Sequence, residues 1–256
     1  NNTVYEDKIG LVIQQFITFL YHLLTERRFF KNYASAKEKR FSQIKTSIMY
    51  SLYTKPLSYS KLLKNVPDYL SEDGTEFDKA LSEVSTFMEP KGLADNGVFV
   101  LKDNLYSKID PLRLDNLENE FESSASIIKS HLATSKEDVN KTILVPQLIH
   151  PKHLDPLTMR LGAFTRTGVF AKLMYKLLQV CLDTENGLFL NELLHLIHCV
   201  FKDDEQVNGK SSIPQNFISK SICNLFLSIA NAKSDIFSES ITSKADYLLE
   251  VMIRKN

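Results

Sequence analysis

Apolar residues recur at helical spacing between Tyr5 and Phe30. The period near 3.6 residues predicts one long helix, whose apolar stripe consists of Ile9, Val12, Ile13, Phe16, Ile17, Leu20, Leu23 and Leu24, with Arg27 in line. Its most apolar run, Leu11 to Leu24, contains Gln14, Gln15, Thr18 and His22 and is shorter than the roughly 20 apolar residues that a membrane span needs. We therefore expect no membrane role, and we expect this helix to pack against later elements of the protein.

The pattern then changes to short helical periods separated by prolines. Lys31 to Arg40 is basic and polar, which predicts a solvated connector. A first short helix is predicted over Ile44–Thr54 and ends before Pro56, because the residue before a proline avoids the α region. Ser58 is the expected N-cap of a second helix, which Pro67 closes.

A third helix is predicted after the polar turn Ser71–Gly74, with Thr75 and Asp78 as a variant of the capping box. Its expected buried face consists of Phe77, Ala80, Leu81, Val84, Phe87 and Met88. Pro90 breaks the helix, and a hairpin should follow, made of Gly92–Ala94, the turn Asp95–Gly97 and Val98–Leu101. Asn-Gly favours this turn because both of its central residues need positive φ.

The second half of the chain predicts a linker followed by helices. Pro111–Leu132 carries a weak helical stripe, Thr134–Lys141 is a polar loop, and the prolines of Val145–Pro156 predict an extended strap. Later helices are predicted over Leu157–Leu182 with breaks at Gly162 and Gly168, over Leu188–Phe201, over Pro214–Ala230 and over Asp235–Arg254, with a polar loop at Lys202–Ser212. Leu188–Phe201 is apolar on nearly all sides, so it should lie at the centre of its bundle.

These elements together predict a mainly α fold. A winged-helix unit of three helices and a short β-hairpin is preceded by a long helix and followed by a helical bundle. The predicted domains are a long packing helix with its connector (1–40), the winged-helix domain (41–110), a helical and proline-containing linker (111–156) and a helical scaffold domain (157–256). The 256 residues suffice for one or two domains.

Charge and cysteine content exclude several classes of protein. Lys+Arg and Asp+Glu both number 31, so no global field draws the chain to nucleic acid or anionic lipid. The three cysteines, Cys181, Cys199 and Cys223, form no CxxC pair, which is typical of a reducing compartment. Because the chain begins with Asn1 and has no signal-peptide pattern, we expect it to be a section of a longer protein.

The histidines are the strongest candidates for chemistry, and the pattern favours a structural role for them. His195 and His198 are spaced i, i+3 beside Cys199, but a structural zinc needs four ligands and no second pair follows. A Cys199–His195 nucleophile is disfavoured, because a thiolate needs an electropositive, accessible site. His150 and His153, in the strap, are also expected to be structural. We therefore predict no catalytic, cofactor-binding or metal-binding residue in this chain.

Winged helices often bind DNA through their third helix, which usually carries basic or amide side chains. In this chain the helix and its end carry Glu76, Asp78, Glu83 and Glu89 against Lys79. Phosphates would be repelled by such a face. The sequence favours a winged helix that docks on protein, or one that is purely architectural, over one that binds nucleic acid.

Several segments resemble the middle region of the UBR-family N-recognins in order and spacing. They are Leu24–Arg27, Lys55–Ser60 with Leu63 and Val66–Pro67, Val84–Phe87 and Gly97–Lys102. The resemblance covers roughly Phe16 to Lys102, continues more weakly to about Phe201, and is closest to a budding-yeast-type member. Pro90–Gly92 has one residue more than the family pattern, and the strap lacks an expected cysteine.

The resemblance implies a function located mostly outside this chain. N-recognins are RING-type E3 ubiquitin ligases that read N-degrons and ubiquitinate substrates with a Rad6-type E2. None of their zinc-binding Cys/His sets occurs in this sequence, so zinc is expected in other parts of the parent protein. The implied role is a non-catalytic scaffold that positions the substrate-reading and RING/E2 modules, partnered by the other domains of the ligase and located in the cytoplasm, with the nucleus as a second place.

Two alternatives remain open from the residues alone. One is a non-catalytic winged-helix adaptor of a large protein-interaction complex, and the other is a DNA-binding regulator.

Overall fold

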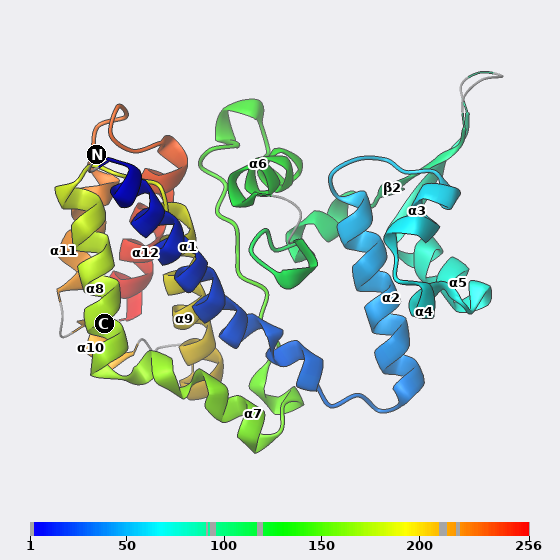
Figure 1. The fold of residues 1–256 in the computed structure, drawn as a ribbon, viewed down its shortest axis with the longest axis horizontal. Helices are drawn as coiled ribbons and strands as arrows, with labels where there is room; N and C mark the ends of the chain where they lie inside the picture. Colours follow the sequence, from blue (N-terminus) through cyan, green and yellow to red (C-terminus); the bar gives the residue numbers. More distant parts are fainter. Residues whose placement is uncertain are drawn as a thin grey trace. The chain divides into compact units, whose positions relative to one another are not determined.

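The chain forms two compact units in a computed structural model that describes residues 3–90, 92, 96–116, 120–209, 214–218 and 221–255 (Figure 1). The helical unit consists of Asn1–Lys31, Leu112–Leu114 and Glu137–Asn256, and the winged-helix unit consists of Asn32–Pro111 and Asp115–Lys136. The predicted domain limits at 40, 110 and 156 stay predictions.

The winged-helix unit contains the predicted helices and wing, so the expected fold class is confirmed. Its elements are α2 (Ala36–Leu52), α3 (Tyr59–Asn65), α4 (Asp68–Ser71), α5 (Gly74–Val84), β1 (Ser85–Met88), β2 (Val98–Leu101), the 3-10 helix η2 (Asp103–Lys108) and α6 (Phe121–Leu132). The strands β1 and β2 form one antiparallel hairpin, in which Ser85 is opposite Leu101 and Met88 is opposite Val98. A further 3-10 helix, η3 (Leu114–Asn116), precedes α6.

The first helix of this unit begins earlier than predicted. α2 starts at Ala36, so the connector expected over Lys31–Arg40 is helical in its second half. Ser35 caps the helix by accepting a hydrogen bond from the Glu38 backbone N–H (3.1 Å), and the Glu38 carboxylate accepts one from the Ala34 N–H (2.8 Å). This is a capping box, and it favours a helical start despite the basic residues around it.

The third helix differs from the prediction at both ends. Asp73 is its N-cap, not Thr75, and the Asp73 carboxylate accepts hydrogen bonds from the backbone N–H groups of Thr75 (3.0 Å) and Glu76 (3.2 Å). The helix ends at Val84, where the Ser85 hydroxyl donates to the Leu81 carbonyl (2.6 Å). Phe87 and Met88, predicted on its buried face, lie instead on β1 and are 52% and 45% exposed.

The wing is therefore built from a different first strand than expected. The segment Ser85–Met88 pairs with Val98–Leu101, whereas the sequence pattern placed the first strand at Gly92–Ala94. Leu93, Ala94 and Asp95 lie outside the described residues. Aromatic and hydroxyl residues after Val84 favour an extended strand, a signal that the helical spacing of Phe87 and Met88 concealed.

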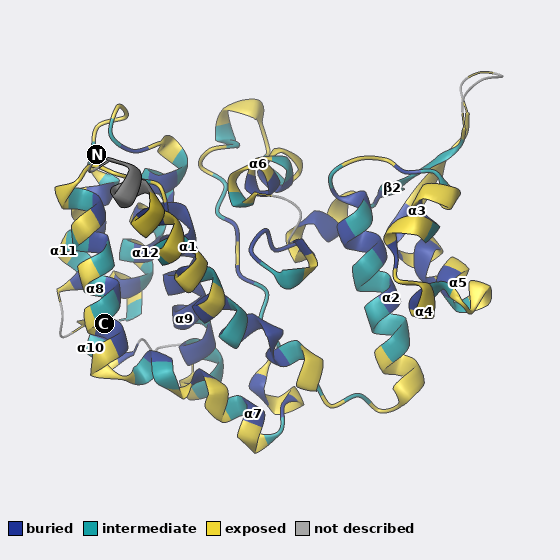
Figure 2. Cartoon of the chain, viewed as in Figure 1, coloured by how far each residue is buried: buried dark blue, intermediate teal, exposed yellow. Residues whose placement is uncertain are grey.

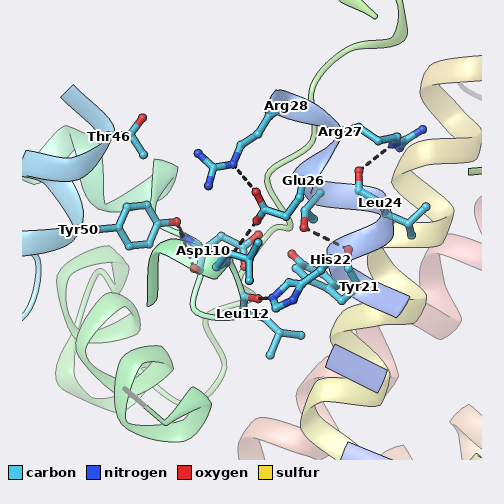
Figure 3. Close-up of polar contacts among 12 residues, drawn as sticks. Tyr21, His22, Leu24, Glu26, Arg27, Arg28, Thr46, Tyr50, Asp110 and Leu112 are labelled. Atoms are coloured by element: carbon cyan, nitrogen blue, oxygen red, sulfur yellow. Dashed lines mark hydrogen bonds and ion pairs between the residues drawn. The ribbon is translucent and has the colours of Figure 1, made fainter. Parts of the chain in front are cut away.

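Neutral polar side chains connect α2 to the rest of the winged-helix core. The Tyr53 hydroxyl is hydrogen-bonded to the Asn116 amide oxygen and to the Ser124 hydroxyl (2.9 Å). The Tyr50 hydroxyl donates to the Asp110 carbonyl (3.2 Å) and accepts from the Asp110 N–H (3.0 Å), as Figure 3 shows. Around them pack buried apolar side chains that include Ile44, Ile48, Leu52, Leu62, Phe77, Ala80, Leu81, Val84 and Leu101.

The helical unit is organised around α9 (Leu190–Asn208). The other elements are α1 (Thr3–Thr25), η1 (Glu26–Phe30), η4 (Lys136–Asp138), η5 (Pro151–His153), α7 (Pro156–Arg160), η6 (Leu161–Arg166), α8 (Gly168–Asp183), α10 (Gln215–Ile218), α11 (Ile222–Ala230) and α12 (Glu239–Lys255). Every residue from Leu190 to Phe201 is buried (Figure 2), and α9 packs against α1, α8 and α12. The predicted central position of this segment is confirmed.

Two predictions for this unit were wrong in part, and the breaks predicted at Gly162 and Gly168 are confirmed. α9 continues to Asn208, so the expected loop from Lys202 is helical for most of its length, while residues 210–213 lie outside the described ones. The helix expected over Leu157–Leu182 is divided into α7, η6 and α8, with the predicted breaks near Gly162 and Gly168. The helix expected over Pro214–Ala230 is two elements, α10 and α11.

The apolar stripe predicted along α1 is only partly buried. Ile17, Leu20 and Leu24 are buried on the side that packs against α9, whereas Ile9, Val12 and Phe16 are 59%, 65% and 43% exposed. The segment Lys8–Phe30 is long and apolar enough to cross a membrane by length and composition, which corrects the shorter run counted from sequence. Core helices meet the same criterion, so this observation alone does not indicate a membrane span.

Candidate functional site

A buried ionic network in the helical unit joins the end of α1 to α9. The Arg27 guanidinium pairs with the Asp203 carboxylate, and the two side chains are 2% and 1% exposed. Arg27 Nε also donates to the Leu24 carbonyl (2.8 Å), which fixes the guanidinium against its own chain. Arg27 therefore anchors η1, which directly follows α1, to a carboxylate that is far away in sequence.

A second arginine extends this network to η6. The Arg166 guanidinium lies 3.5 Å from Asp203 Oδ2 and donates through Nε to Asp204 Oδ1 (2.8 Å). Asn208 Nδ2 also donates to Asp204 Oδ1 (2.7 Å). Two cations face two carboxylates, and of these four side chains only Arg166, at 31% exposed, reaches solvent. We call Arg27, Arg166, Asp203 and Asp204 the ionic junction.

Gly162 packs tightly against the ionic junction. A Cβ atom at this position would lie 2.9 Å from Arg27 Nη1 and 3.0 Å from Asp203 Oδ2. In the sequence, Gly162 indicates only a break in a helix, and the ion pair is not predicted. The one available signal was Arg27 in the apolar stripe of α1, since a charged residue in such a stripe needs a buried partner.

The neighbouring Glu26 forms a hydrogen bond to the backbone of another segment of the same unit, at Leu114. Its carboxylate accepts from Arg28 Nε (2.7 Å) and from the Leu114 N–H (3.2 Å). One turn earlier, His22 Nε2 lies 2.8 Å from the Leu112 carbonyl oxygen (Figure 3). The Leu24–Arg27 motif is thus buried and takes part in the contacts of both Arg27 and Glu26. These contacts give the motif a structural role.

The histidines considered for metal binding lie in the core of the helical unit with other partners. His195 is 3.2 Å from the Tyr21 hydroxyl. His198 Nδ1 accepts from the Lys244 ammonium (2.6 Å), which also donates to the Leu144 carbonyl (2.8 Å). Burial, followed by the charge of Lys244, holds the pKa of His198 well below its usual value of 6.5. His198 is therefore neutral and is oriented by a lysine.

The other residues considered for metal binding or catalysis do not form a site with His195 and His198. Within the described residues, no group of three or more His, Cys, Asp or Glu side chains could hold a metal ion. His150 and His153 are exposed, with ring centroids 6.4 Å apart, and His150 Nδ1 accepts from the Lys152 N–H (3.3 Å). Cys199 is fully buried beside His198, and burial raises the pKa of Cys181 to about 12.

The acidic residues of α5 face basic residues of α2 within the winged-helix unit. Glu76 pairs with Lys37 (3.6 Å) and Arg40 (3.5 Å), and Glu83 pairs with Lys45 (3.0 Å). These cations belong to α2, whereas the predicted repulsion of phosphates rests on the charges of α5 alone. The negative field of α5 is therefore weaker than its own charges predict, and exclusion of nucleic acid stays a prediction.

Comparison with known proteins gives matches that span the whole chain. Residues 43–143 match the winged-helix domain of the E3 ubiquitin-protein ligase UBR1-like family. The chain is 67% identical over 254 residues to the E3 ubiquitin-protein ligase UBR1 of Saccharomyces cerevisiae, covering 99% of this chain and 13% of that protein. It is 26% identical over 201 residues to UBR2 of the same yeast, covering 77% of this chain and 11% of that protein.

A more distant relative is similar to a smaller part of the chain. The E3 ubiquitin-protein ligase ubr1 of Schizosaccharomyces pombe is 31% identical over 87 residues, which is 34% of this chain and 4% of that protein. The chain therefore spans a small fraction of the length of the curated relatives it matches.

Proposed function

We propose a scaffold function for this chain, which belongs to the UBR1-type family of E3 ubiquitin-protein ligases. In this proposal the chain holds the substrate-reading part and the RING/E2 part of the parent ligase at a fixed distance and angle. The substrate lysine is then kept near the E2-bound ubiquitin thioester. Holding two reactants in productive geometry can lower a barrier by several kcal/mol, about 7–11 in favourable cases.

The observation that best supports this proposal is the ionic junction. Asp203 lies between Arg27 of η1 and Arg166 of η6, so three elements distant in sequence are joined by directional contacts. A buried charge that loses its partner is costly, so these elements resist sliding or rotating past one another. Such resistance is the physical property that a spacer between two functional modules needs.

The proposal assigns the reactive partners to other parts of the parent protein. N-degron substrates, ubiquitin and a Rad6-type E2 would bind there, as would zinc. The chain itself would contact the other domains of the ligase, in the cytoplasm and the nucleus. The family match favours this proposal over a winged-helix adaptor of an unrelated complex, because the similarity to a ligase extends over 99% of the chain.

The test replaces residues 1–256 in the full-length ligase by a flexible Gly/Ser linker. Such a linker keeps both modules in one molecule but lets their separation fluctuate. We expect binding of an N-degron peptide and of the E2 to be retained, while ubiquitin transfer to a substrate lysine falls about tenfold to a hundredfold. Peptide binding by fluorescence anisotropy and single-turnover transfer would be measured on the same preparations.

Two results would contradict the scaffold proposal. One is a loss of peptide or E2 binding in the linker variant as large as the loss of transfer, because the chain would then bind those partners directly. The other is discharge of ubiquitin from a charged E2 by the 256-residue chain alone. A full-length ligase with Glu83→Ala, which changes only a half-exposed ion pair, is the matched control and should transfer ubiquitin at the normal rate.

A further inference from the structure

A lysine-rimmed pocket lies on the winged-helix unit, in the segment that follows α2. It has a volume of about 320 Å³ and is lined by Lys55, Pro56, Leu57, Lys61, Lys64 and Asn65. The first three residues belong to the loop between α2 and α3, and the last three belong to α3. All six residues belong to one unit, so the pocket does not depend on how the two units are arranged.

The floor of this pocket is apolar and fixed in place. Leu57 is 5% exposed, and its backbone is paired with β2 through two hydrogen bonds. The Leu57 N–H donates to the Phe99 carbonyl (3.1 Å), and the Phe99 N–H donates to the Leu57 carbonyl (2.8 Å). Pro56 restricts the backbone directly before it. The pocket is therefore held open by the backbone and does not need a ligand to form.

The rim of the pocket carries three ammonium groups without an acidic partner among the described residues. Lys55, Lys61 and Lys64 are exposed, and none forms an ion pair with a described carboxylate. Other cations of this unit, such as Lys37 and Lys45, do pair with α5. Lys61 and Lys64 are spaced i, i+3 on a seven-residue helix, a spacing at which like charges repel.

We propose that this pocket binds an acidic peptide segment of a partner polypeptide. An apolar side chain of the segment would cover Pro56 and Leu57, while flanking carboxylates would pair with the three lysines. The Asn65 side-chain amide adds a neutral donor and acceptor at the end of the pocket. Carboxylates with an intervening apolar side chain match both the charge of the rim and the apolar floor.

The shape of the pocket favours a peptide over a nucleic acid. A volume of about 320 Å³ accommodates one or two side chains and does not form the extended basic track that follows a phosphate backbone. The same unit also carries Asp78 on α5, which accepts a hydrogen bond from the Tyr59 hydroxyl of α3 (2.8 Å), and this carboxylate would weaken binding to a polyanion longer than the pocket. A short acidic peptide avoids that repulsion.

The test uses the 256-residue chain and a fluorescein-labelled peptide of alternating aspartate and leucine, with fluorescence anisotropy as the readout. We expect Lys55→Glu, Lys61→Glu and Lys64→Glu each to weaken binding about fivefold to tenfold at low salt. Lys172→Glu, on an exposed lysine of the helical unit, is the matched control and should leave the affinity unchanged. Thermal unfolding of each variant shows whether the fold is retained.

Several results would overturn the proposal. They are failure of the peptide to bind the chain, an equal loss of affinity with Lys172→Glu, and tighter binding of a short DNA duplex at the same lysines. A peptide with serine in place of leucine should bind more weakly, and equal binding would exclude a role for the apolar floor. Binding to the chain but not to the full-length ligase would show that another part of the ligase covers the pocket, which would exclude a separate partner. The binding readout is independent of ubiquitin transfer, so failure here leaves the scaffold proposal unaffected.

Discussion

The Arg27–Asp203 ion pair of the helical unit and the Lys45–Glu83 ion pair of the winged-helix unit differ in burial. The helical unit buries Arg27, Asp203 and Asp204 in its interior. The winged-helix unit keeps its ion pairs near the surface, where the side chains of Lys45 and Glu83 are 37% and 40% exposed. Its core buries Asp110 and Lys129 together with neutral hydrogen-bonding groups, such as the Tyr53 hydroxyl bonded to Asn116 and Ser124.

This difference shows where each unit is sensitive to change. Two buried charges cost much desolvation energy, and their attraction offsets that cost only in one good geometry. Exposed pairs are screened by water and contribute about 0–1 kcal/mol. We therefore expect the helical unit to be intolerant of charge removal at the ionic junction, and the winged-helix unit to tolerate charge removal at its surface.

The largest effect is expected from Asp203→Ala. This change removes the carboxylate that pairs with the buried Arg27 guanidinium, while Asp204 still pairs with Arg166. Breaking a buried pair in this way costs about 3–5 kcal/mol. Urea unfolding of the 256-residue chain, followed by circular dichroism, measures the change in the free energy of unfolding. Hydrogen exchange with mass spectrometry should locate the loss of protection in α1, η6 and α9.

The matched control removes both partners of the buried pair. In the double variant Arg27→Leu with Asp203→Leu, apolar side chains replace the charges, and most of the lost stability should return. If the double variant is as unstable as Asp203→Ala, packing at this position would matter more than charge, and the comparison between the units would lose its basis.

A smaller effect is expected from Tyr53→Phe in the core of the winged-helix unit. The substitution removes a hydroxyl that bonds Asn116 and Ser124, but these two side chains keep their own hydrogen bond (2.8 Å). The expected cost is about 1–2 kcal/mol, measured in the same unfolding assay. Tyr69→Phe, at a side chain that is 59% exposed, should change the stability very little. A cost for Tyr53→Phe as large as that of Asp203→Ala would contradict the proposed difference between the units.

Acid should destabilise the helical unit through His198. Its pKa in the folded state is well below the usual 6.5, whereas in the unfolded chain it binds a proton near that value. The unfolded state therefore binds more protons below about pH 6.5, so stability is complete above this pH and is lost as the pH falls toward the folded-state pKa.

His198→Gln tests this pH dependence. Glutamine can still accept from Lys244 but does not titrate, so the free energy of unfolding should depend less steeply on pH between about 7 and 5. His153→Gln, at an exposed histidine, is the control. An unchanged slope for His198→Gln would assign the acid sensitivity to other groups.

Local patterns predicted most elements of the fold, while pairings between distant residues were missed. The apolar run ending at Phe201 was enough to place α9 at the centre of the helical unit, because a helix that is apolar on all sides is expected to be buried. The first strand of the wing was misplaced, since Phe87 and Met88 have helical spacing and only pairing with Val98–Leu101 makes them a strand.

The ionic junction was beyond prediction from sequence for the same reason. Arg27 and Asp203 are separated by 176 positions, and no local signal tells which carboxylate a buried arginine will meet. The polar residues after Phe201 indicated a loop, although two of them, Asp203 and Asp204, are buried helical residues that bind arginines. The lysine-rimmed pocket was not predicted either, because Lys55–Ser60 indicated only a helix boundary and a family motif.

The smallest effect is expected from Glu83→Ala in the winged-helix unit. Its partner Lys45 is half-exposed and regains hydration when the carboxylate is removed, so the free energy of unfolding should fall by no more than about 1 kcal/mol. Raising the salt concentration should reduce that difference further, because exposed pairs are screened. The same increase in salt should change the cost of Asp203→Ala much less, since the Arg27–Asp203 pair is buried and shielded from ions. If salt reduced both costs by the same fraction, the buried and exposed pairs would be equivalent in energy, and the contrast between the two units would be one of position alone.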